Sequence, residues 1–246
     1  MRMKQSVFEV LSNTALTDSV YKMVLGGDTT AITAPGQFVN IQLSGQFLSR
    51  PISVCDYDDA TLTLVYKVVG KGTGIMSTMQ PGEKLDILTG LGNGYDLSKA
   101  GDAPLLIGGG VGVPPMYNLA KKLLALGKKV TVILGFNTKN EIFYEEEFKK
   151  LGCTVLVTTV DGSYGIKGFV TDALPECYSY FYTCGPEPML KAIYRATTTS
   201  GQMSFEERMG CGFGACMGCS CKTITGYKRI CKEGPVMRKK EILWEN

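Results

Sequence analysis

Hydrophobic and polar positions alternate in short runs along residues 1–98, which is the pattern of half-buried strands. The clearest run is Thr61–Tyr66, where apolar side chains recur at every second position and mark one buried face. Turn sequences such as Gln80-Pro81-Gly82 separate the runs. The pattern predicts six short strands, at Val7–Leu11, Val20–Leu25, Phe38–Leu43, Ile52–Cys55, Leu62–Val69 and Lys84–Leu88. Strands at this spacing predict a small antiparallel barrel.

The periodicity changes along residues 99–201, where apolar runs alternate with helical patterns. The apolar runs predict strands at Leu105–Ile107, Val130–Leu134, Val155–Val160 and Tyr180–Tyr182. Helices are predicted from Pro114-Pro115 onward, at Glu145–Leu151 and at Pro188–Thr197. The spacing within the first helix places Met116, Leu119, Leu123 and Leu126 on its inner face and Lys121, Lys122 and Lys128 in solvent. Such alternation predicts a parallel sheet with helices on both faces.

Residues 202–246 form a short C-terminal segment rich in cysteine, glycine and lysine. A segment of this size cannot bury a stable core alone, so it needs a staple or must dock on another surface. The chain therefore predicts a multi-domain β plus α/β architecture. We expect a six-stranded antiparallel barrel over residues 1–98, a parallel-sheet domain over residues 99–201 and a small cysteine-rich domain over residues 202–246.

The composition is that of a folded protein, because 44% of the 246 residues are hydrophobic and only 20% are charged. A net charge of +3 is too small to indicate binding to nucleic acid or to an anionic membrane. The N-terminal residues lack the apolar run of a secretory signal, and no stretch reaches the roughly 18 apolar residues of a membrane-spanning helix. We expect a soluble, cytoplasmic protein that binds neither nucleic acid nor membrane.

Two residue counts narrow the chemistry. The chain has no histidine, which excludes serine–histidine and cysteine–histidine catalysis and all histidine-ligated metals. It has nine cysteines, and five of them crowd into residues 211–231. In the absence of an export signal, a metal site explains this crowding better than a disulfide framework.

The spacing of Cys211, Cys216, Cys219 and Cys231 is C-x4-C-x2-C-x11-C, and its first part is the plant-type pattern for a [2Fe–2S] cluster. A loop that wraps a cluster needs residues that tolerate positive φ and close approach, and this loop has Gly210, Gly212, Gly214, Ala215 and Gly218. The alternative is a structural zinc site, although zinc sites usually pair two short knuckles. Cys221 lies too close to Cys219 for both to bind easily, so we expect it to pack inward or beside the cluster.

Two motifs in the barrel half indicate an anionic cofactor. Arg50-Pro51-Ile52-Ser53 opens a strand, and its arginine could clamp a pyrophosphate while its serine hydroxyl reaches a flavin nitrogen. Gly70-Lys71-Gly72-Thr73 follows another strand, and its amides would form an anion site at the start of a short helix. Each motif alone also fits an ordinary strand edge or turn. Their joint occurrence in a six-stranded barrel favours a flavin site.

Two further motifs lie in the parallel-sheet half. Gly108-Gly109-Gly110-Val111-Gly112 joins a strand to a helix, and such a turn lets the backbone approach a dinucleotide pyrophosphate. It departs from G-x-G-x-x-G because two prolines follow, so a plain packing joint remains the alternative. Cys184-Gly185-Pro186 ends a later strand. Ligands collect at the carboxyl ends of parallel strands, so both motifs should face one crevice.

Taken in order, these motifs resemble the ferredoxin–NADP reductase superfamily and, within it, the electron-transfer subunits of NAD-linked (class 1B) dihydroorotate dehydrogenase, over essentially the whole chain. The resemblance implies that FAD is bound by Arg50, Pro51, Ile52, Ser53, Val65, Tyr66, Lys67, Gly72 and Thr73. It implies that Cys211, Cys216, Cys219 and Cys231 hold a [2Fe–2S] cluster. NAD(H) would bind at Gly108, Gly109, Gly110 and Gly112, with Cys184 near the nicotinamide as the candidate catalytic residue.

The resemblance also implies an oxidoreductase function and a partner. A catalytic subunit carrying FMN would oxidise dihydroorotate in pyrimidine biosynthesis, and its electrons would pass through the cluster and FAD to NAD in a heterotetramer with two copies of each subunit. The alternatives are a reductase subunit of another NAD(P)H-linked complex, of ferredoxin or sulfide type, and a non-catalytic, zinc-stapled nucleotide-binding module. The run Gly135–Glu141 has a single cation and no arginine pair for a 2′-phosphate, which favours NAD over NADP.

Overall fold

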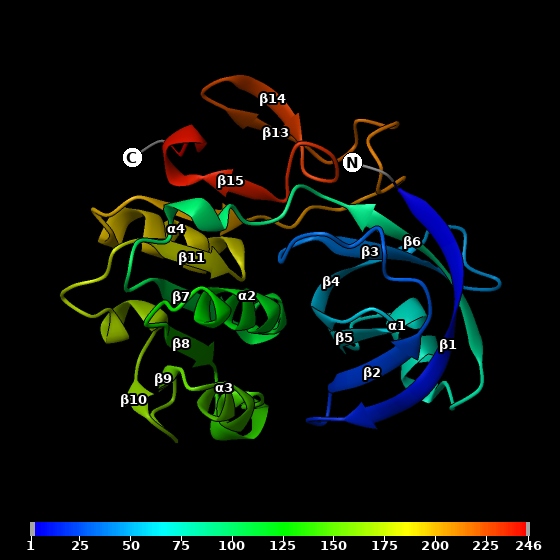
Figure 1. The fold of residues 1–246 in the computed structure, drawn as a ribbon, viewed down its shortest axis with the longest axis horizontal. Coiled ribbons are helices and arrows are strands. Elements are labelled where there is room, and N and C mark those ends of the chain that lie inside the picture. The colour runs from blue at the N-terminus through cyan, green and yellow to red at the C-terminus, as the bar shows by residue number, and fades with distance from the viewer. Residues whose placement is uncertain (1–2, 245–246) are drawn as a thin grey trace.

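A barrel and a parallel sheet lie side by side in the protein, and a small C-terminal segment packs across both (Figure 1). The structure is a computed structural model that describes residues 3–244. This arrangement confirms the predicted multi-domain β plus α/β fold. Within the described residues, none of the helices has the length and apolar character needed to cross a membrane.

The barrel is closed, antiparallel and ordered β1-β2-β5-β4-β3-β6, which confirms all six predicted strands. Its strands are β1 (Lys4–Ala15), β2 (Val20–Gly26), β3 (Phe38–Gln42), β4 (Arg50–Tyr57), β5 (Thr61–Lys67) and β6 (Lys84–Leu91). The alternation in β5 sends Leu62, Leu64 and Tyr66 into the barrel core. Helix α1 (Lys71–Thr78) adds the fully buried Met76 to the same core.

The sheet has seven strands in the order β10-β9-β8-β7-β11-β12-β15, parallel except at β15. They are β7 (Leu105–Gly109), β8 (Thr131–Phe136), β9 (Thr154–Thr159), β10 (Ile166–Lys167), β11 (Phe181–Cys184), β12 (Gly201–Ser204) and β15 (Val236–Arg238). The four predicted strands are present. The expected domain boundary between residues 201 and 202 falls inside β12, so we propose to place it after Ser204.

Helices cover both faces of the sheet, as predicted. Helices α2 (Pro114–Ala125) and α3 (Glu145–Leu151) pack on the face toward the barrel, and α4 (Glu187–Ala196) packs on the opposite face (Figure 1). Met116, Leu119 and Leu123 are fully buried, but the placement of Leu126 on the inner face is wrong, because this side chain is 59% exposed. Helix α2 ends one residue earlier, and Leu126 begins the turn completed by Gly127 at φ +74°.

Helix α2 also fixes the barrel against the sheet. Asp56 of β4 accepts hydrogen bonds from Asn118 Nδ2 at 2.7 Å and from Lys121 Nζ at 2.6 Å. Lys121 is therefore an interdomain partner rather than a free surface lysine. Next to it, the buried Cys55 thiol donates to the hydroxyl of Tyr144 at 3.3 Å. These contacts set the width of the space between the two halves.

The C-terminal segment docks rather than folding alone. Its hairpin of β13 (Ser220–Thr223) and β14 (Gly226–Arg229) stands apart from the sheet, whereas β15 pairs antiparallel with β12 and extends the sheet. Ile230, Cys231 and Met237 share one hydrophobic core with residues of the sheet and α4. Of the two alternatives expected for this segment, a staple or docking, the structure shows docking.

Candidate functional site

A cavity of about 790 Å³ opens where the barrel, the sheet and the C-terminal segment meet. The barrel contributes Pro51, Ser53 and Lys67 to its wall, and the carboxyl ends of the parallel strands contribute the opposite wall. Glu206, Met209 and Pro235 close the side formed by the C-terminal segment. Both predicted nucleotide motifs of the sheet face this one crevice, as expected.

The two predicted motifs of the barrel come together in space. Arg50 begins β4, and its side chain lies directly against Gly72 at the start of α1: a Cβ at Gly72 would fall 2.0 Å from Arg50 Nε. The guanidinium also donates to Gln46 Oε1 at 3.1 Å and to the Leu48 carbonyl. Glycine at this position thus allows an arginine and a helix start to share one corner, an arrangement of donors that suits an anion.

Not every predicted barrel residue presents its side chain to a ligand. Tyr66 is buried in the barrel, where its hydroxyl donates to Asn13 Oδ1 at 3.1 Å, and Ile52 packs against the same core. Val65 is buried between the two domains. Thr73 Oγ1 accepts from the amides of Val69 at 3.0 Å and Gly70 at 3.3 Å, which caps α1. These residues can contribute main-chain groups and shape, whereas Ser53 and Lys67 contribute side chains.

The glycine turn after β7 is both a packing joint and part of the cavity wall. A Cβ at Gly112 would lie 2.2 Å from the carbonyl oxygen of Cys184, and one at Gly109 would lie 2.4 Å from Met189 Sδ. Gly108 packs in the same way against Val113 and does not line the cavity. Gly110 has φ +52° and open space where a side chain would be. The turn therefore leaves bare backbone facing the cavity at the start of α2.

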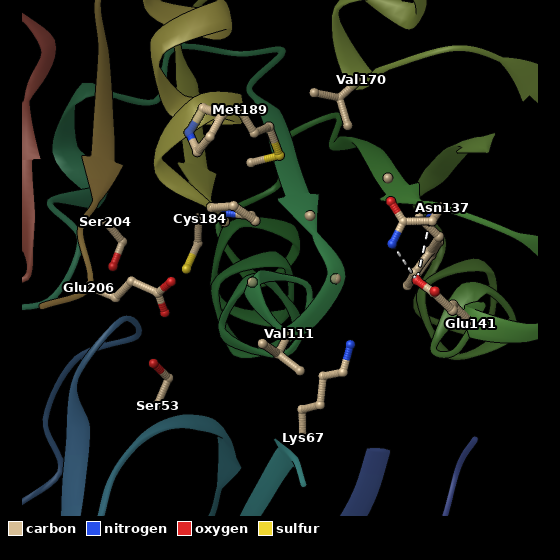
Figure 2. Close-up of a pocket in the computed structure, with 18 of the residues that line it drawn as sticks. Ser53, Lys67, Val111, Asn137, Glu141, Val170, Cys184, Met189, Ser204 and Glu206 are labelled. Carbon is tan, nitrogen blue, oxygen red and sulfur yellow. Dashed lines mark hydrogen bonds between the residues drawn. The ribbon is translucent and has the colours of Figure 1, made fainter. Parts of the chain in front are cut away.

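Cys184 ends β11 and lines the cavity close to Ser204 and Glu206, with Ser53 of the barrel across from them (Figure 2). Burial raises the pKa of the Cys184 thiol to about 12, so the thiol is neutral at ordinary pH. Burial, followed by the neighbouring Glu207, also raises the pKa of Glu206. Ser204 and Glu206 could not be predicted from the sequence, because β12 carries no apolar run that identifies it as a strand.

The other end of the cavity lies at the ends of β8 and β9. Glu141 Oε2 accepts hydrogen bonds from Asn137 Nδ2 at 2.9 Å and from the Asn137 amide at 3.4 Å (Figure 2). Thr158 also lines the cavity, and its buried hydroxyl has no hydrogen-bond partner among residues 3–244. A buried hydroxyl without a partner favours a polar ligand at this end of the cavity.

The cysteine loop begins where the cavity wall ends at Met209. Cys211 Sγ accepts hydrogen bonds from the amides of Ala215 at 3.2 Å and Cys216 at 3.4 Å, and Cys219 Sγ accepts one from the Cys231 amide at 3.5 Å. The Asn40 side chain of β3 donates to the Cys211 carbonyl at 3.2 Å. Backbone N–H groups that donate to sulfur favour thiolates and tune the reduction potential of an iron–sulfur cluster.

The four predicted ligands lie as two pairs. Burial acts to raise the pKa of Cys211, but hydrogen bonds from the amides of Cys216, Phe213 and Ala215 and from the Cys216 thiol lower it to about 6. Burial and the adjacent Cys219 thiol raise the pKa of Cys231 to about 12. Within residues 3–244, no three potential ligands surround a single point. Two thiol pairs suit a cluster with two irons, each of which takes two thiolates.

Cys221 lies in β13, half-buried against the core that contains Cys219 and Cys231. Burial raises the pKa of its thiol. Its position beside the paired thiols, with its side chain packed on the core, is the one expected from the sequence.

Two protein-family models match the chain. The model described as the iron-sulfur cluster binding domain of dihydroorotate dehydrogenase B matches residues 206–243. The oxidoreductase NAD-binding domain matches residues 106–195.

Curated relatives match over nearly the full length. The chain is 43% identical to the dihydroorotate dehydrogenase B (NAD(+)) electron transfer subunit of Geobacillus sp. (strain WCH70), covering 98% of this chain and 99% of the relative. It is 44% identical to the subunit of the same name from Fusobacterium nucleatum subsp. nucleatum, covering 92% and 94%.

Solved structures share the fold. A chain of the NADH-dependent reduced ferredoxin–NADP oxidoreductase, described for flavin-based electron bifurcation, superposes with a TM-score of 0.87 at 30% identity, covering 97% of this chain and 90% of that one. A ferredoxin–NADP⁺ reductase from Neisseria gonorrhoeae with bound FAD and NADP superposes with a TM-score of 0.69 at 16% identity, covering 78% and 90%, and shows likeness of fold alone.

Proposed function

The chain belongs to the family of dihydroorotate dehydrogenase B (NAD(+)) electron transfer subunits, and on that premise we propose that it carries electrons between a catalytic subunit and NAD through a [2Fe–2S] cluster and FAD. FAD, when bound, would supply both hydride exchange with the nicotinamide and single-electron exchange with the cluster. The protein's task is to hold these groups in order and to keep water away. The main support for this proposal is that the barrel, the glycine turn after β7 and the cysteine segment all line the same cavity.

The barrel side of the cavity suits FAD. Arg50 and the amides at Gly72 and Thr73 form one corner that can hold a pyrophosphate. Ser53 and Lys67 line the cavity, whereas Arg50, Gly72 and Thr73 do not, and the two cavity side chains can hydrogen-bond to the flavin ring. Pro51, Ile52, Val65 and Tyr66 would then shape the site and supply main-chain groups.

The sheet side suits NAD. Bare backbone at Gly109, Gly110 and Gly112 permits a pyrophosphate to approach the start of α2, with Gly108 packing behind it. Cys184 and Glu206 would lie at the nicotinamide end, where the Cys184 thiol, kept neutral by burial, would not act as a nucleophile. Glu141 and Thr158 would lie at the adenosine end. The carboxylate of Glu141 can accept from a ribose hydroxyl and would repel a 2′-phosphate, which favours NAD.

The cysteine segment would hold the cluster on Cys211, Cys216, Cys219 and Cys231 and present it to the partner. Phe213 and Met217 flank these cysteines with 43% and 54% of their surface exposed. Apolar side chains beside a redox centre suit docking of a subunit that must bring its own cofactor close. We propose that the partner carries FMN, that two copies of each subunit assemble, and that the complex serves pyrimidine biosynthesis in the cytoplasm.

Co-expression with a candidate catalytic subunit tests this function. The purified complex should show flavin and iron–sulfur absorption and should form NADH from NAD and dihydroorotate. A coloured complex that oxidises NADH with a ferredoxin but not with the dihydroorotate subunit would favour the other reductase function, for which the 30% identity to the ferredoxin–NADP oxidoreductase chain is the supporting observation. A colourless, zinc-containing protein would support the binding module.

A further inference from the structure

Arg229, the last residue of β14, bridges the two parts of the cysteine segment. Its Nη1 donates a hydrogen bond to the Gly214 carbonyl at 2.7 Å. On its other side, Nε donates to Glu233 Oε2 at 2.9 Å and Nη2 pairs with the second carboxylate oxygen. A guanidinium held by two parallel bonds has a fixed plane. Arg229 is thus aimed at one peptide of the cysteine loop.

That peptide also contacts sulfur. The Gly214 carbonyl and the Ala215 N–H belong to one planar unit, in which the two groups point in opposite directions. The Ala215 N–H donates to Cys211 Sγ at 3.2 Å. A hydrogen bond on the carbonyl fixes the plane and polarises the N–H at its other end. Arg229 therefore acts on the Cys211 sulfur through a single peptide group.

The local backbone explains why this peptide needs support. Gly214 has φ +94°, a conformation that glycine adopts without strain. Because glycine has no side chain, the contact that holds this conformation in place must come from another residue. Arg229 supplies the external contact. Its own carbonyl accepts the amides of Lys232 at 3.0 Å and Glu233 at 2.9 Å, in the turn that carries Cys231. One residue thus organises the backbone around ligands on both sides of the segment.

The barrel anchors the same turn. Asn93 Nδ2 donates to the Glu233 carbonyl at 3.2 Å and to the Val236 carbonyl at 2.7 Å. The Glu233 carboxylate that orients Arg229 is therefore attached to a residue whose backbone is tied to the barrel. The side chain of Arg229 is largely covered, with 22% of its surface exposed, and its charge is paired with the Glu233 carboxylate, so its main effect on the loop is the hydrogen bond to Gly214.

We propose that Arg229 is a positioning residue that raises the reduction potential of the cluster by fixing and polarising the Gly214–Ala215 peptide toward Cys211. The inference rests on the proposed function, because it requires a cluster on the four cysteines. Reduction adds one negative charge, and both an N–H donor to sulfur and a nearby cation stabilise the reduced form more than the oxidised form.

The experiment is an EPR-monitored redox titration of the cluster in the complex with its catalytic subunit, comparing variants at Arg229. Arg229→Gln removes the positive charge and the hydrogen bond to the Gly214 carbonyl. Arg229→Lys keeps the charge but loses the paired hydrogen bonds to Glu233 that fix the guanidinium plane. We expect Arg229→Gln to shift the reduction equilibrium about three- to tenfold toward the oxidised form, or about 30–60 mV by the one-electron relation of 59 mV per tenfold change. Arg229→Lys should shift it less.

Lys232→Gln is the matched control. Lys232 lies in the same turn, and its alkyl stem, not its ammonium group, is the part that lies against Gly214. This variant removes one positive charge near the loop and leaves the Arg229 bond intact. We expect its shift to be less than about twofold, because an exposed charge is well screened.

Iron and sulfide analysis distinguishes a failure of the proposed function from a failure of the role of Arg229. Absence of iron from the wild-type complex would overturn the proposed function. A loaded Arg229→Gln protein with the wild-type potential, or a Lys232→Gln shift as large as that of Arg229→Gln, would overturn the role of Arg229 alone. If Arg229→Gln does not load, Arg229→Lys gives the decisive comparison, because it keeps the positive charge and loses the paired hydrogen bonds that fix the guanidinium. Arg229→Lys should lower the potential by a smaller amount, and a loaded Arg229→Lys protein with the wild-type potential would contradict the inference.

Discussion

The side-chain amide of Asn40, on strand β3 of the barrel, donates a hydrogen bond to the backbone carbonyl of Cys211 at 3.2 Å. A residue of the proposed flavin domain thereby holds the first residue of the cysteine loop. Gly212, the next residue, has φ +76°, and a Cβ there would lie 2.6 Å from Asn40 Nδ2. The absence of a side chain at residue 212 is what lets the loop approach the barrel so closely.

Replacing Asn40 should loosen that attachment. We expect Asn40→Ala to lower the free energy of unfolding by about 1–2 kcal/mol, because one bond is lost and a partly buried carbonyl is left without its donor. The cluster should also be lost faster in air, followed by the decay of its visible absorption. Gln42→Ala, on the exposed end of the same strand, is the control. Equal effects of the two substitutions would contradict the role given to Asn40.

The contact of Asp56 with Lys121 and Asn118 should couple the two large domains. Asp56 and Lys121 are partly covered, with side chains 22% and 40% exposed. In a double-mutant cycle of Asp56→Ala and Lys121→Ala, we expect a coupling free energy of about 1 kcal/mol, measured by denaturant unfolding. The pair of Lys128 with the fully exposed Asp102 is the control and should show no measurable coupling. Similar coupling free energies in both pairs would show that the Asp56–Lys121 contact stabilises the protein no more than an exposed ion pair does.

Glu141 should decide which nicotinamide nucleotide is used. We expect Glu141→Gln to reduce the ratio of kcat/KM for NADH over NADPH about three- to tenfold, mainly by improving NADPH, because the repulsion of a 2′-phosphate is removed. Flavin bleaching in a stopped-flow instrument measures both substrates. Glu146→Gln, on the exposed face of α3, removes an equal charge outside the cavity. An unchanged NADH-to-NADPH ratio in Glu141→Gln would mean that the adenosine end of the nucleotide does not bind beside Glu141.

The Cys184 thiol should react slowly with alkylating agents. Its pKa is raised to about 12 by burial, so at pH 8 the thiolate fraction is on the order of 10⁻⁴. The alkylation rate should rise about tenfold per pH unit from pH 7 without a plateau below pH 10. Because the folded pKa lies above the ordinary value of 9.0, this group's contribution to stability is complete below about pH 9 and is lost as the pH approaches 12.

Peptide mass spectrometry of the cluster-loaded protein follows each cysteine separately. The exposed Cys177 provides the internal comparison and should be modified at least tenfold faster than Cys184 at pH 8. A Cys184 rate that levels off near pH 8 would mean that the thiolate forms readily and that a neutral thiol beside the nicotinamide is the wrong description.

Features that depend on residues close together in the sequence could be predicted from it. Alternation in residues such as Leu62 and Leu64 was enough to place the barrel strands, and the loop spacing of Cys211, Cys216 and Cys219 was enough to indicate an iron–sulfur site. Arg50 and Gly72 were predicted as separate motifs, but their direct contact depends on how the barrel closes, which no local pattern records.

The features that the sequence did not predict correctly, the end of α2 and two cavity residues, also have physical causes. Leu126 continued the helical apolar pattern, but the helix ended before it, and boundaries depend on capping geometry that periodicity does not contain. Ser204 and Glu206 became cavity residues because Gly201–Ser204 pairs with β11 on one side and β15 on the other. A strand of four residues without an apolar run forms only because its neighbours supply the pairing.

The most direct test of the relay is to remove one cluster ligand and measure the two halves of the reaction separately. In the complex of Cys231→Ala with its catalytic subunit, NADH should still bleach the flavin at close to the wild-type rate, because the proposed FAD and NAD sites lie in the barrel and sheet. NAD reduction by dihydroorotate should be lost, and Cys177→Ala should leave both activities unchanged. If Cys231→Ala still reduced NAD with dihydroorotate at the wild-type rate, electrons would not pass through the cysteine segment and the proposed relay would be wrong.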